Sequence, residues 1–281
     1  RLIPPAIGYP FCDLIADWIS TRRESKVIQA IRVNQWVARG MNLGKEELDQ
    51  AARETLRHNA RSLYDLYHYI ERPKAVQRMI RLSSEARELL ERPEFASRGL
   101  VVAGLHLSSF DLILQSLCRQ GLKILVLTIP EPQGGRRVEY EMRKRTGMNL
   151  LPTSVGALRQ AVKYLEQGGM VLTGLDRPVP GAKFRPKFFG HPAPLPIHYA
   201  YLASRACVPV MIMAAIQGTD GKYHIMNSEP IEMDDHAEGD KGNLRNAEKV
   251  LRRAEDFIRL APRQWNVPLP VWPELLGKAP G

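Results

Sequence analysis

The sequence predicts an α/β protein with a mostly parallel central sheet flanked by helices and a helical N-terminal elaboration. After residue 98, short apolar runs alternate with helical stretches. Those runs are apolar on both faces, which is typical of parallel strands covered by helices on both sides. Residues 1–95 have helical patterns, many basic side chains and no convincing strand. We therefore divide the chain into a helical N-terminal region, residues 1–95, and an α/β domain, residues 96–281.

The first helix is expected after Pro10, because three nearby prolines disfavour a helix before it. Five apolar residues then share one face at helical spacing: Phe11, Leu14, Ile15, Trp18 and Ile19. The basic segment "TRRESK" follows. An apolar face with a tryptophan and a basic flank is typical of helices at a membrane interface. Packing of the same face against the protein's own core is the alternative.

The clearest helix covers "KEELDQAARETLRHNARSLYDLYHYIERP". Its apolar residues follow the 3.6-residue period: Leu48, Ala52, Leu56, Leu63, Leu66 and Ile70. Acidic residues occupy its first turn, and Pro73 ends it. We expect its two histidines, His58 and His68, to be solvated or structural.

The remaining elements alternate along the chain. The expected strands are "GLVVAGL", "LKILVLT", "MNLLP", "MVLTGL" and "VPVMIMAAI". The expected helices fall near 109–119, 135–146, 155–167, 194–206 and 243–260. Ligands bind beyond the carboxyl ends of the strands in such sheets, so the residues that follow each strand are the candidates for function.

The net charge of +10 predicts a negatively charged partner: nucleic acid, an anionic membrane surface or a phosphorylated ligand. The charge is spread along the chain without a helix-turn-helix pattern, an RNP-like strand or a zinc site, so we do not expect nucleic acid binding. The scattered Cys12, Cys118 and Cys207 fit a reducing compartment. No run approaches the ~18 apolar residues of a transmembrane helix. Peripheral attachment and an anchor upstream of Arg1 both stay open.

The segment "HLSSFDL" joins the first strand of the α/β domain to the helix after it. His106 ends the strand, and Ser108 is a candidate N-cap that would place Asp111 in the first helical turn. From there the carboxylate can fold back toward the imidazole, fix its tautomer and stabilise its charged form, as a general base requires. An acidic residue also favours a helix start whatever its neighbours. No GxSxG elbow supports a serine nucleophile.

"HLSSFD" resembles the HxxxxD motif of the glycerolipid/lysophospholipid acyltransferase superfamily. Three later segments resemble conserved blocks of bacterial glycolipid acyltransferases, in the same order: "PEPQGGRRVEYEMRKRTGMNLLP", "GLDRPVPGAKFRPKFFGHPAPLP" and "PRQWNVPLPVW". Upstream, "RVNQWVARGMNLGKEEL" is similar to the helical stretch that precedes the domain in that family. The chain resembles the branch that contains lipid A late acyltransferases and phosphatidylinositol mannoside acyltransferases, with Asp111 and the "LDRP" segment closer to the mannoside type.

The resemblance implies transfer of a fatty acyl group from a thioester, on coenzyme A or acyl carrier protein, to a lipid or sugar hydroxyl. These co-substrates are the only cofactors implied, and no metal is. His106 would be the general base and Asp111 would orient it. Backbone N–H groups near Ser108 or the "GLD" turn would stabilise the oxyanion. Such an enzyme would act at the cytoplasmic face of the bacterial inner membrane.

The same resemblance suggests further substrate-binding residues. Arg143 matches the arginine of the second block and would contact a phosphate of donor or acceptor, although a solvated helix face is the alternative. Glu131 would orient a sugar hydroxyl or an arginine. Asp176 and Arg177 follow the "MVLTGL" strand and form either a structural ion pair or part of the site.

Two features of the following loop complete the expected substrate region. "KFFG" would line an acyl channel or the core, and the basic loop "RPVPGAKFRPK" would meet anionic headgroups. A lipid-binding or thioesterase-like relative of the same fold is the remaining alternative, because water in place of an alcohol would give hydrolysis.

Overall fold

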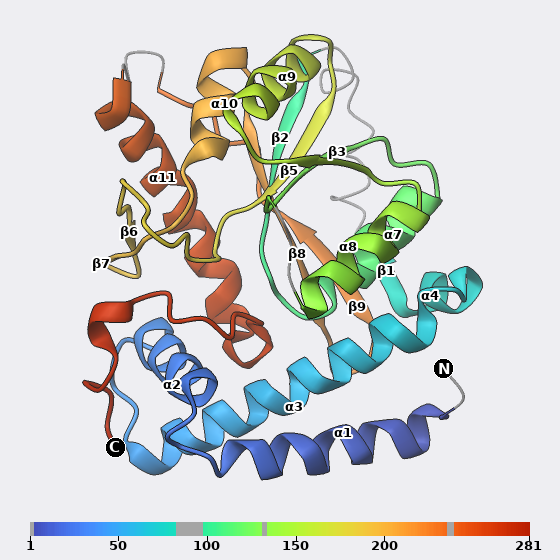
Figure 1. Ribbon diagram of the computed structural model, residues 1–281, viewed down its shortest axis with the longest axis vertical. Coiled ribbons are helices and arrows are strands. Elements are labelled where there is room, and N and C mark those ends of the chain that lie inside the picture. The colour runs from blue at the N-terminus through green and yellow to red at the C-terminus, as the bar shows by residue number, and fades with distance from the viewer. Residues whose placement is uncertain (1–2, 83–97, 131–133, 235–238) are drawn as a thin grey trace.

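The computed structural model describes residues 3–82, 98–130, 134–234 and 239–281. Four helices come first: α1 (Pro5–Ser20), α2 (Lys26–Ala38), α3 (Lys45–Tyr69) and α4 (Pro73–Met79). They lie together at one end of the sheet, with α1 outside α3 (Figure 1). Among the described helices, none is both long and apolar enough to cross a bilayer.

The central sheet has seven strands in the order β1-β9-β8-β2-β5-β3-β4. Their bounds are β1 Ile80–Leu82, β2 Leu100–Gly104, β3 Leu125–Thr128, β4 Asn149–Pro152, β5 Met170–Gly174, β8 Val210–Gln217 and β9 Tyr223–Asn227. Every neighbouring pair in this sheet is parallel except β8 with β9. The α/β class with a mostly parallel sheet is therefore confirmed.

Helices cover both faces of the sheet (Figure 1). Alternate residues of β2 point to opposite sides. Val101 and Ala103 join the core beneath α9 (Val155–Glu166), α10 (His198–Ala206) and α11 (Gly239–Leu260). Leu100 and Val102 pack toward α7 (Phe110–Arg119) on the other face. α8 (Gly135–Arg145) lies beside α7, where Met142 packs near Leu112.

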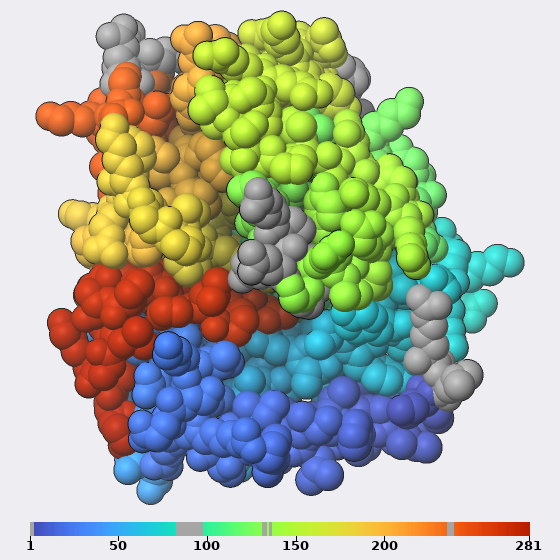
Figure 2. Space-filling model, viewed as in Figure 1, coloured from blue at the N-terminus to red at the C-terminus, as the bar shows by residue number. Residues whose placement is uncertain are grey.

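The C-terminal segment lies between the N-terminal helices and the α/β part, where Figure 2 shows it in red against the blue helices. It follows α11 and contains two short 3-10 helices, Pro262–Gln264 and Pro273–Leu275. Asn34 of α2 holds it: its Nδ2 donates to the carbonyls of Val267 and Leu269 at 2.9 and 2.8 Å. Its Oδ1 accepts from the Val271 amide at 3.0 Å. The "RVNQW" stretch of α2 thus holds the C-terminal segment in place through Asn34.

Two expectations about the N-terminal region were wrong. α1 begins at Pro5 and contains Pro10, rather than starting after it. Pro5 occupies the first helical turn, where no N–H is needed, and Pro10 lies on an exposed face where the carbonyl it leaves unpaired can meet water. The region also contains a strand, because β1 pairs in parallel with β9.

The remaining differences concern small elements. The alternation signal is too short to detect a three-residue strand such as β1, and β9 was missed in the same way. The two-residue strands of the antiparallel hairpin, β6 (Lys187–Phe188) and β7 (His191–Pro192), were not anticipated either. The boundary drawn between residues 95 and 96 lies outside the described residues.

Candidate active site

His106 and Asp176 meet at the carboxyl edge of the sheet. Gly104 of β2 and Gly174 of β5 are register partners, and each is followed two residues later by one member of the pair. His106 Nδ1 lies 2.5 Å from Asp176 Oδ1, and the His106 amide donates to Asp176 Oδ2 at 3.0 Å. A Cβ on Gly174 would stand 2.9 Å from Cε1 of His106, so only glycine leaves room for the imidazole.

Trp265 completes the hydrogen bonding of Asp176. Its indole Nε1 donates to Asp176 Oδ2 at 2.8 Å, and both side chains are buried. The backbone holds Trp265 beside the loop, because the Ser108 amide donates to Gln264 O at 2.8 Å and the Asn266 amide donates to His106 O at 2.7 Å. The C-terminal segment therefore orients the Asp176 carboxylate, which in turn orients the His106 ring.

The electrostatics favour a neutral imidazole and an ionised carboxylate. Burial lowers the pKa of His106 and the neighbouring Arg177 lowers it further, whereas Asp176 acts in the opposite direction. Burial works against ionisation of Asp176, but the His106 ring and the Trp265 indole hold the pKa of that carboxyl below its usual value. An ionised Asp176 requires the proton on Nδ1, so Nε2 is left as an acceptor.

Asp111 does not reach the imidazole as expected from the sequence; its hydrogen bond goes to Arg143. Arg143 Nε donates to Asp111 Oδ1 at 2.8 Å, and both side chains are largely buried. Burial works against the charge of Arg143, but Asp111 and Glu139 raise the pKa of its guanidinium. The orienting carboxylate of His106 is Asp176, because the start of α7 directs Asp111 toward α8 instead.

The loop after His106 also differs from the expected N-cap. Ser109, not Ser108, precedes the first helical residue of α7, because Ser108 has a left-handed backbone with φ of 50°. The Ser108 side chain is buried against α3, where Oγ lies 3.0 Å from His58 Nε2. Its amide is already bonded to Gln264 O, so it is not a free oxyanion donor.

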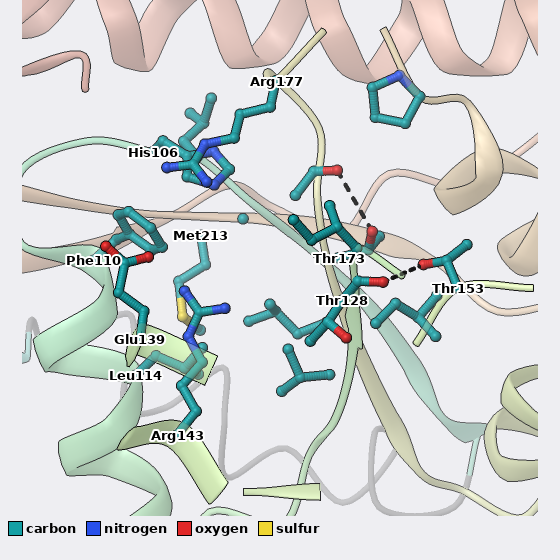
Figure 3. A pocket seen from close by; sticks show the side chains of 18 of the residues that line it. His106, Phe110, Leu114, Thr128, Glu139, Arg143, Thr153, Thr173, Arg177 and Met213 are labelled. Carbon is teal, nitrogen blue, oxygen red and sulfur yellow. Dashed lines mark hydrogen bonds between the residues drawn. The ribbon is translucent and has the colours of Figure 1, made fainter. Parts of the chain in front are cut away.

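A largely apolar cavity of about 350 Å³ opens in front of His106 (Figure 3). Its apolar wall comes from α7 and from the strands β3, β5 and β8, and includes Ile113, Leu114, Leu117, Val126, Leu172 and Met213. The polar residues on its border are His106, Glu139, Arg143 and Arg177, with Thr128, Thr153, Thr173 and His198 on another side. A largely apolar cavity with polar groups on its border suits an apolar ligand that carries a polar reactive end.

The charged residues around the cavity come from separate elements. Figure 3 shows the Arg177 side chain extending to the His106 ring, while Glu139 and Arg143 enter from α8. Phe110 packs edge-to-face on His106, with ring centroids 4.5 Å apart. Asp176 is thus bonded to His106, and Arg177 and Arg143 line the same cavity as the ring, whereas Glu131 lies outside the described residues.

Other candidate groups fall elsewhere. Phe188 belongs to the buried core, where it stacks on Trp272 with ring centroids 5.7 Å apart. Among the described residues, no cluster of three or more His, Cys, Asp or Glu side chains could hold a metal ion.

Trp265 is the site residue that the sequence argument missed, although "PRQW" had been noticed as a motif. The pairing of His106 with Asp176 is also marked in the sequence, by the way the two strands end. Both strands end in Gly-Leu followed by an ionisable residue, "AGLH" and "TGLD". Adjacent parallel strands with equal endings bring those residues level.

The family model described as bacterial lipid A biosynthesis acyltransferase matches residues 1–272. No curated protein is matched by the chain. The matched range includes the His106 loop, the "LDRP" segment that carries Asp176, and Trp265. Because the match spans nearly the whole sequence, the chain belongs to the bacterial lipid A biosynthesis acyltransferase family and is an acyltransferase of lipid biosynthesis.

Proposed function

We propose that the protein transfers a fatty acyl group from an acyl thioester to a hydroxyl of a glycolipid or lysolipid acceptor, with His106 as general base. The observation that carries this proposal is the hydrogen bond between His106 Nδ1 and Asp176 Oδ1. It leaves Nε2 as the basic atom of a ring that lines the apolar cavity. In this arrangement Asp176, rather than Asp111, has the role of the orienting carboxylate.

The reaction needs a base because an alcohol is a weak acid at neutral pH. The acceptor hydroxyl gives its proton to Nε2 while its oxygen attacks the thioester carbonyl carbon. The tetrahedral intermediate then collapses, the carbon–sulfur bond breaks, and the proton passes from Nε2 to the leaving thiolate. A positioned base of this kind contributes roughly 10²–10⁴-fold to the rate. Asp176 stabilises the imidazolium that exists between the two proton transfers.

The residues around His106 have complementary roles in this proposal. The apolar wall formed by α7, β3, β5 and β8 holds the acyl chain. Arg177 lies beside the imidazole and supplies positive charge for the oxyanion or for a phosphate of a substrate. Arg143 faces the same cavity with its Nε bonded to Asp111, so the rest of its guanidinium is oriented for a second anionic group. Donors on coenzyme A and on acyl carrier protein both carry such a phosphate.

The acceptor and the acyl product are lipids, so the enzyme must reach a bilayer, and α1 provides the surface. One face of α1 carries five exposed apolar side chains and no charge, and exposed Ile3 lies just before the helix. We call these six residues the docking face: Ile3, Ile7, Phe11, Leu14, Ile15 and Trp18. The opposite, polar face packs on α3 through Asp13–Arg61 and Asp17–Arg57 ion pairs. A helix that turns its apolar side outward is suited to a membrane interface.

The basic flank of this helix supports attachment to an anionic bilayer. Arg22, Arg23 and Lys26 are exposed just after the docking face, and the Arg22 guanidinium stacks 3.7 Å from the centre of the Trp18 ring. Exposed cations beside an inserted apolar face favour anionic headgroups. We place the protein at the cytoplasmic face of the bacterial inner membrane, which agrees with its three free cysteines.

His106→Ala tests the reaction. The variant is incubated with a thioester donor and a glycolipid acceptor, and acylated product is measured by mass spectrometry together with free thiol. We expect loss of both products from a variant that still folds, which its circular dichroism spectrum checks. His224→Ala is the matched control, because the His224 side chain is exposed and does not line the cavity. Wild-type transfer by His106→Ala would contradict the mechanism, and thiol release without acylated lipid from the wild type would indicate a thioesterase.

A further inference from the structure

Both serines of the "HLSSFD" loop are tethered toward the N-terminal helices. Ser108 Oγ bonds His58 of α3 at 3.0 Å, and Ser109 Oγ donates to the Tyr223 hydroxyl of β9 at 2.9 Å. Ser109 makes no side-chain cap for α7, although it holds the N-cap position. Its hydroxyl is therefore committed to the interior of the protein. The loop between His106 and α7 is thus hydrogen-bonded to α3 and β9 through residues that do not line the cavity.

Asp65 of α3 is the centre of this tether. The Tyr223 hydroxyl that accepts from Ser109 donates to Asp65 Oδ2, and the Tyr9 hydroxyl of α1 donates to Asp65 Oδ1 at 2.7 Å. Asp65 and Tyr223 are each only 1% exposed. A carboxylate at that depth needs its hydrogen bonds, because burial without them is costly. The four residues make a continuous chain from α1 to the catalytic loop: Tyr9, Asp65, Tyr223 and Ser109.

Polar and aromatic contacts carry most of the seat of α1 on α3. Only Gly8 and Ala16 of α1 are buried, and a Cβ on Gly8 would stand 2.3 Å from the Tyr64 ring. Tyr9 packs edge-to-face on the same ring, with centroids 5.3 Å apart. Asp13 and Asp17 form ion pairs whose arginines, Arg61 and Arg57, are 45% and 39% exposed, and exposed ion pairs of this kind stabilise weakly. A bilayer that holds the opposite face of α1 therefore adds to a seat whose ion pairs are open to water.

We propose that α1 positions the catalytic loop through the Tyr9–Asp65–Tyr223–Ser109 chain, so that bilayer attachment of the docking face raises turnover at His106. Tyr9, Asp65 and Tyr223 are positioning residues in this scheme, since none of them lines the cavity. The inference rests on the proposed acyl transfer and membrane attachment. A bilayer that binds the seated form of α1 better shifts the population toward it, and the seated form in turn binds the bilayer more tightly.

The test compares turnover with and without vesicles. Thiol release from a short acyl thioester, with a soluble alcohol as the acyl acceptor, is followed with anionic vesicles that contain phosphatidic acid, with neutral phosphatidylcholine vesicles and with neither. Neither lipid offers a headgroup alcohol, so the acceptor is the same in every arm. For the wild type we expect about fivefold or greater stimulation of kcat by anionic vesicles, the low end of typical couplings between sites. Amide hydrogen exchange of residues 107–112 should slow under the same condition.

Tyr9→Phe removes one hydroxyl from the inner face of α1 and leaves the docking face intact. We expect vesicle sedimentation within about fivefold of the wild type, because the docking face is intact, and unchanged KM. The value of kcat should be lower, without stimulation by vesicles or slowed exchange. Tyr223→Phe breaks the chain of hydrogen bonds at its other end and should lower kcat and remove the stimulation as Tyr9→Phe does. Because Tyr223 is not in α1, the same result in both variants excludes a local disturbance of α1 as the cause. Tyr164→Phe on α9 is the matched control and should retain full stimulation.

The outcomes separate this inference from the function on which it rests. Wild-type stimulation that survives in both Tyr9→Phe and Tyr223→Phe overturns the coupling while the acyltransferase assignment stands. A wild type that turns over equally with and without anionic vesicles overturns it too. Absence of thiol release and acylated lipid from the wild type in every condition would instead remove the proposed function, and the coupling with it.

Discussion

His106 and Asp176 stand level on adjacent parallel strands, with Nδ1 of the ring 2.5 Å from Oδ1 of the carboxylate. Asp176 is completely buried and receives two further hydrogen bonds, from the His106 amide and the Trp265 indole. Three donors converge on one carboxylate, so neither the carboxylate nor the ring is free to turn. The tautomer of the His106 ring, which its proposed role as general base requires, is thereby fixed by the fold before any substrate binds.

Asp176→Asn should lower kcat by about 10²–10⁴-fold, the range attributed to a well-placed base. The amide cannot stabilise the imidazolium, and it permits the wrong tautomer. Asp176 raises the pKa of His106 against the effects of burial and Arg177, so its loss should lower that pKa further. Activity requires the neutral His106 ring. In a plot of kcat/KM against pH, the acidic limb of the wild type should therefore lie below the ordinary histidine pKa of about 6.5. In Asp176→Asn that limb should move to still lower pH. An unmoved limb would contradict the pairing.

The Asp111–Arg143 pair predicts a stability effect distinct from catalysis. Arg143→Ala leaves Asp111 buried without its partner, and Asp111 Oδ2 already has no hydrogen bond among the described residues. Breaking a buried pair in this way costs about 3–5 kcal/mol, measured as the free energy of unfolding in urea. The control, Lys144→Ala, removes an exposed side chain 3.5 Å from Glu141 and should change stability by less than about 0.5 kcal/mol.

Arg143→Lys separates pairing from recognition. Lysine can restore charge for Asp111 but cannot supply the planar fork that a phosphate accepts. We therefore expect recovery of most of the unfolding free energy, with kcat/KM for the thioester still reduced. Equal recovery of both quantities would indicate that Arg143 acts only through Asp111.

The docking face predicts a loss of membrane binding without loss of stability. Leu14 and Trp18 are 67% and 59% exposed, so serine at both positions should leave the melting temperature unchanged. Loss of two partly inserted side chains should weaken binding to anionic vesicles by roughly 2 kcal/mol, about 30-fold in sedimentation. Val155→Ser, at a 70% exposed position on α9, is the matched control. Wild-type binding should also fall as salt rises, because the flanking charges are screened.

Two histidines predict acid destabilisation. Burial lowers the pKa of His198 to about 4, and burial together with Arg61 and Arg263 lowers the pKa of His58 to about 4. Both rings are neutral in the folded protein, so their contribution is intact above pH 6.5 and is lost as the pH falls toward 4, where only the unfolded chain binds the proton. Each ring contributes roughly 2–3 kcal/mol to this loss.

His198→Gln should reduce the difference in unfolding free energy between pH 7 and pH 4.5 by about that amount. Urea denaturation at the two values measures it, and carboxylate contributions cancel because they are common to both proteins. A variant with the wild-type difference would show that His198 titrates normally in the folded state.

The sequence by itself determined the α/β class, the main helices and the candidate residues at the strand ends. These follow from local patterns: apolar runs, helical periodicity and polar residues after a strand. His106, Asp176 and Arg177 follow strands and could be noticed in this way, because the carboxyl edge of a parallel sheet is where such residues gather. Arg143 was suggested by the resemblance to the acyltransferase family instead. Short elements such as β1 escaped, because three residues carry too little periodicity and depend on a partner strand for their hydrogen bonds.

Only the tertiary structure decided which residues are paired. Asp111, five residues from His106, is directed to Arg143 by the start of α7, while Asp176, seventy residues away, is brought level by the β2–β5 register. Trp265 reaches the same carboxylate because Asn34 clamps the C-terminal segment. The outward apolar face of α1 is equally non-local, because ion pairs with α3 turn its polar side inward. Sequence spacing limits which residues can meet locally, but strand register and helix packing determine which of them do.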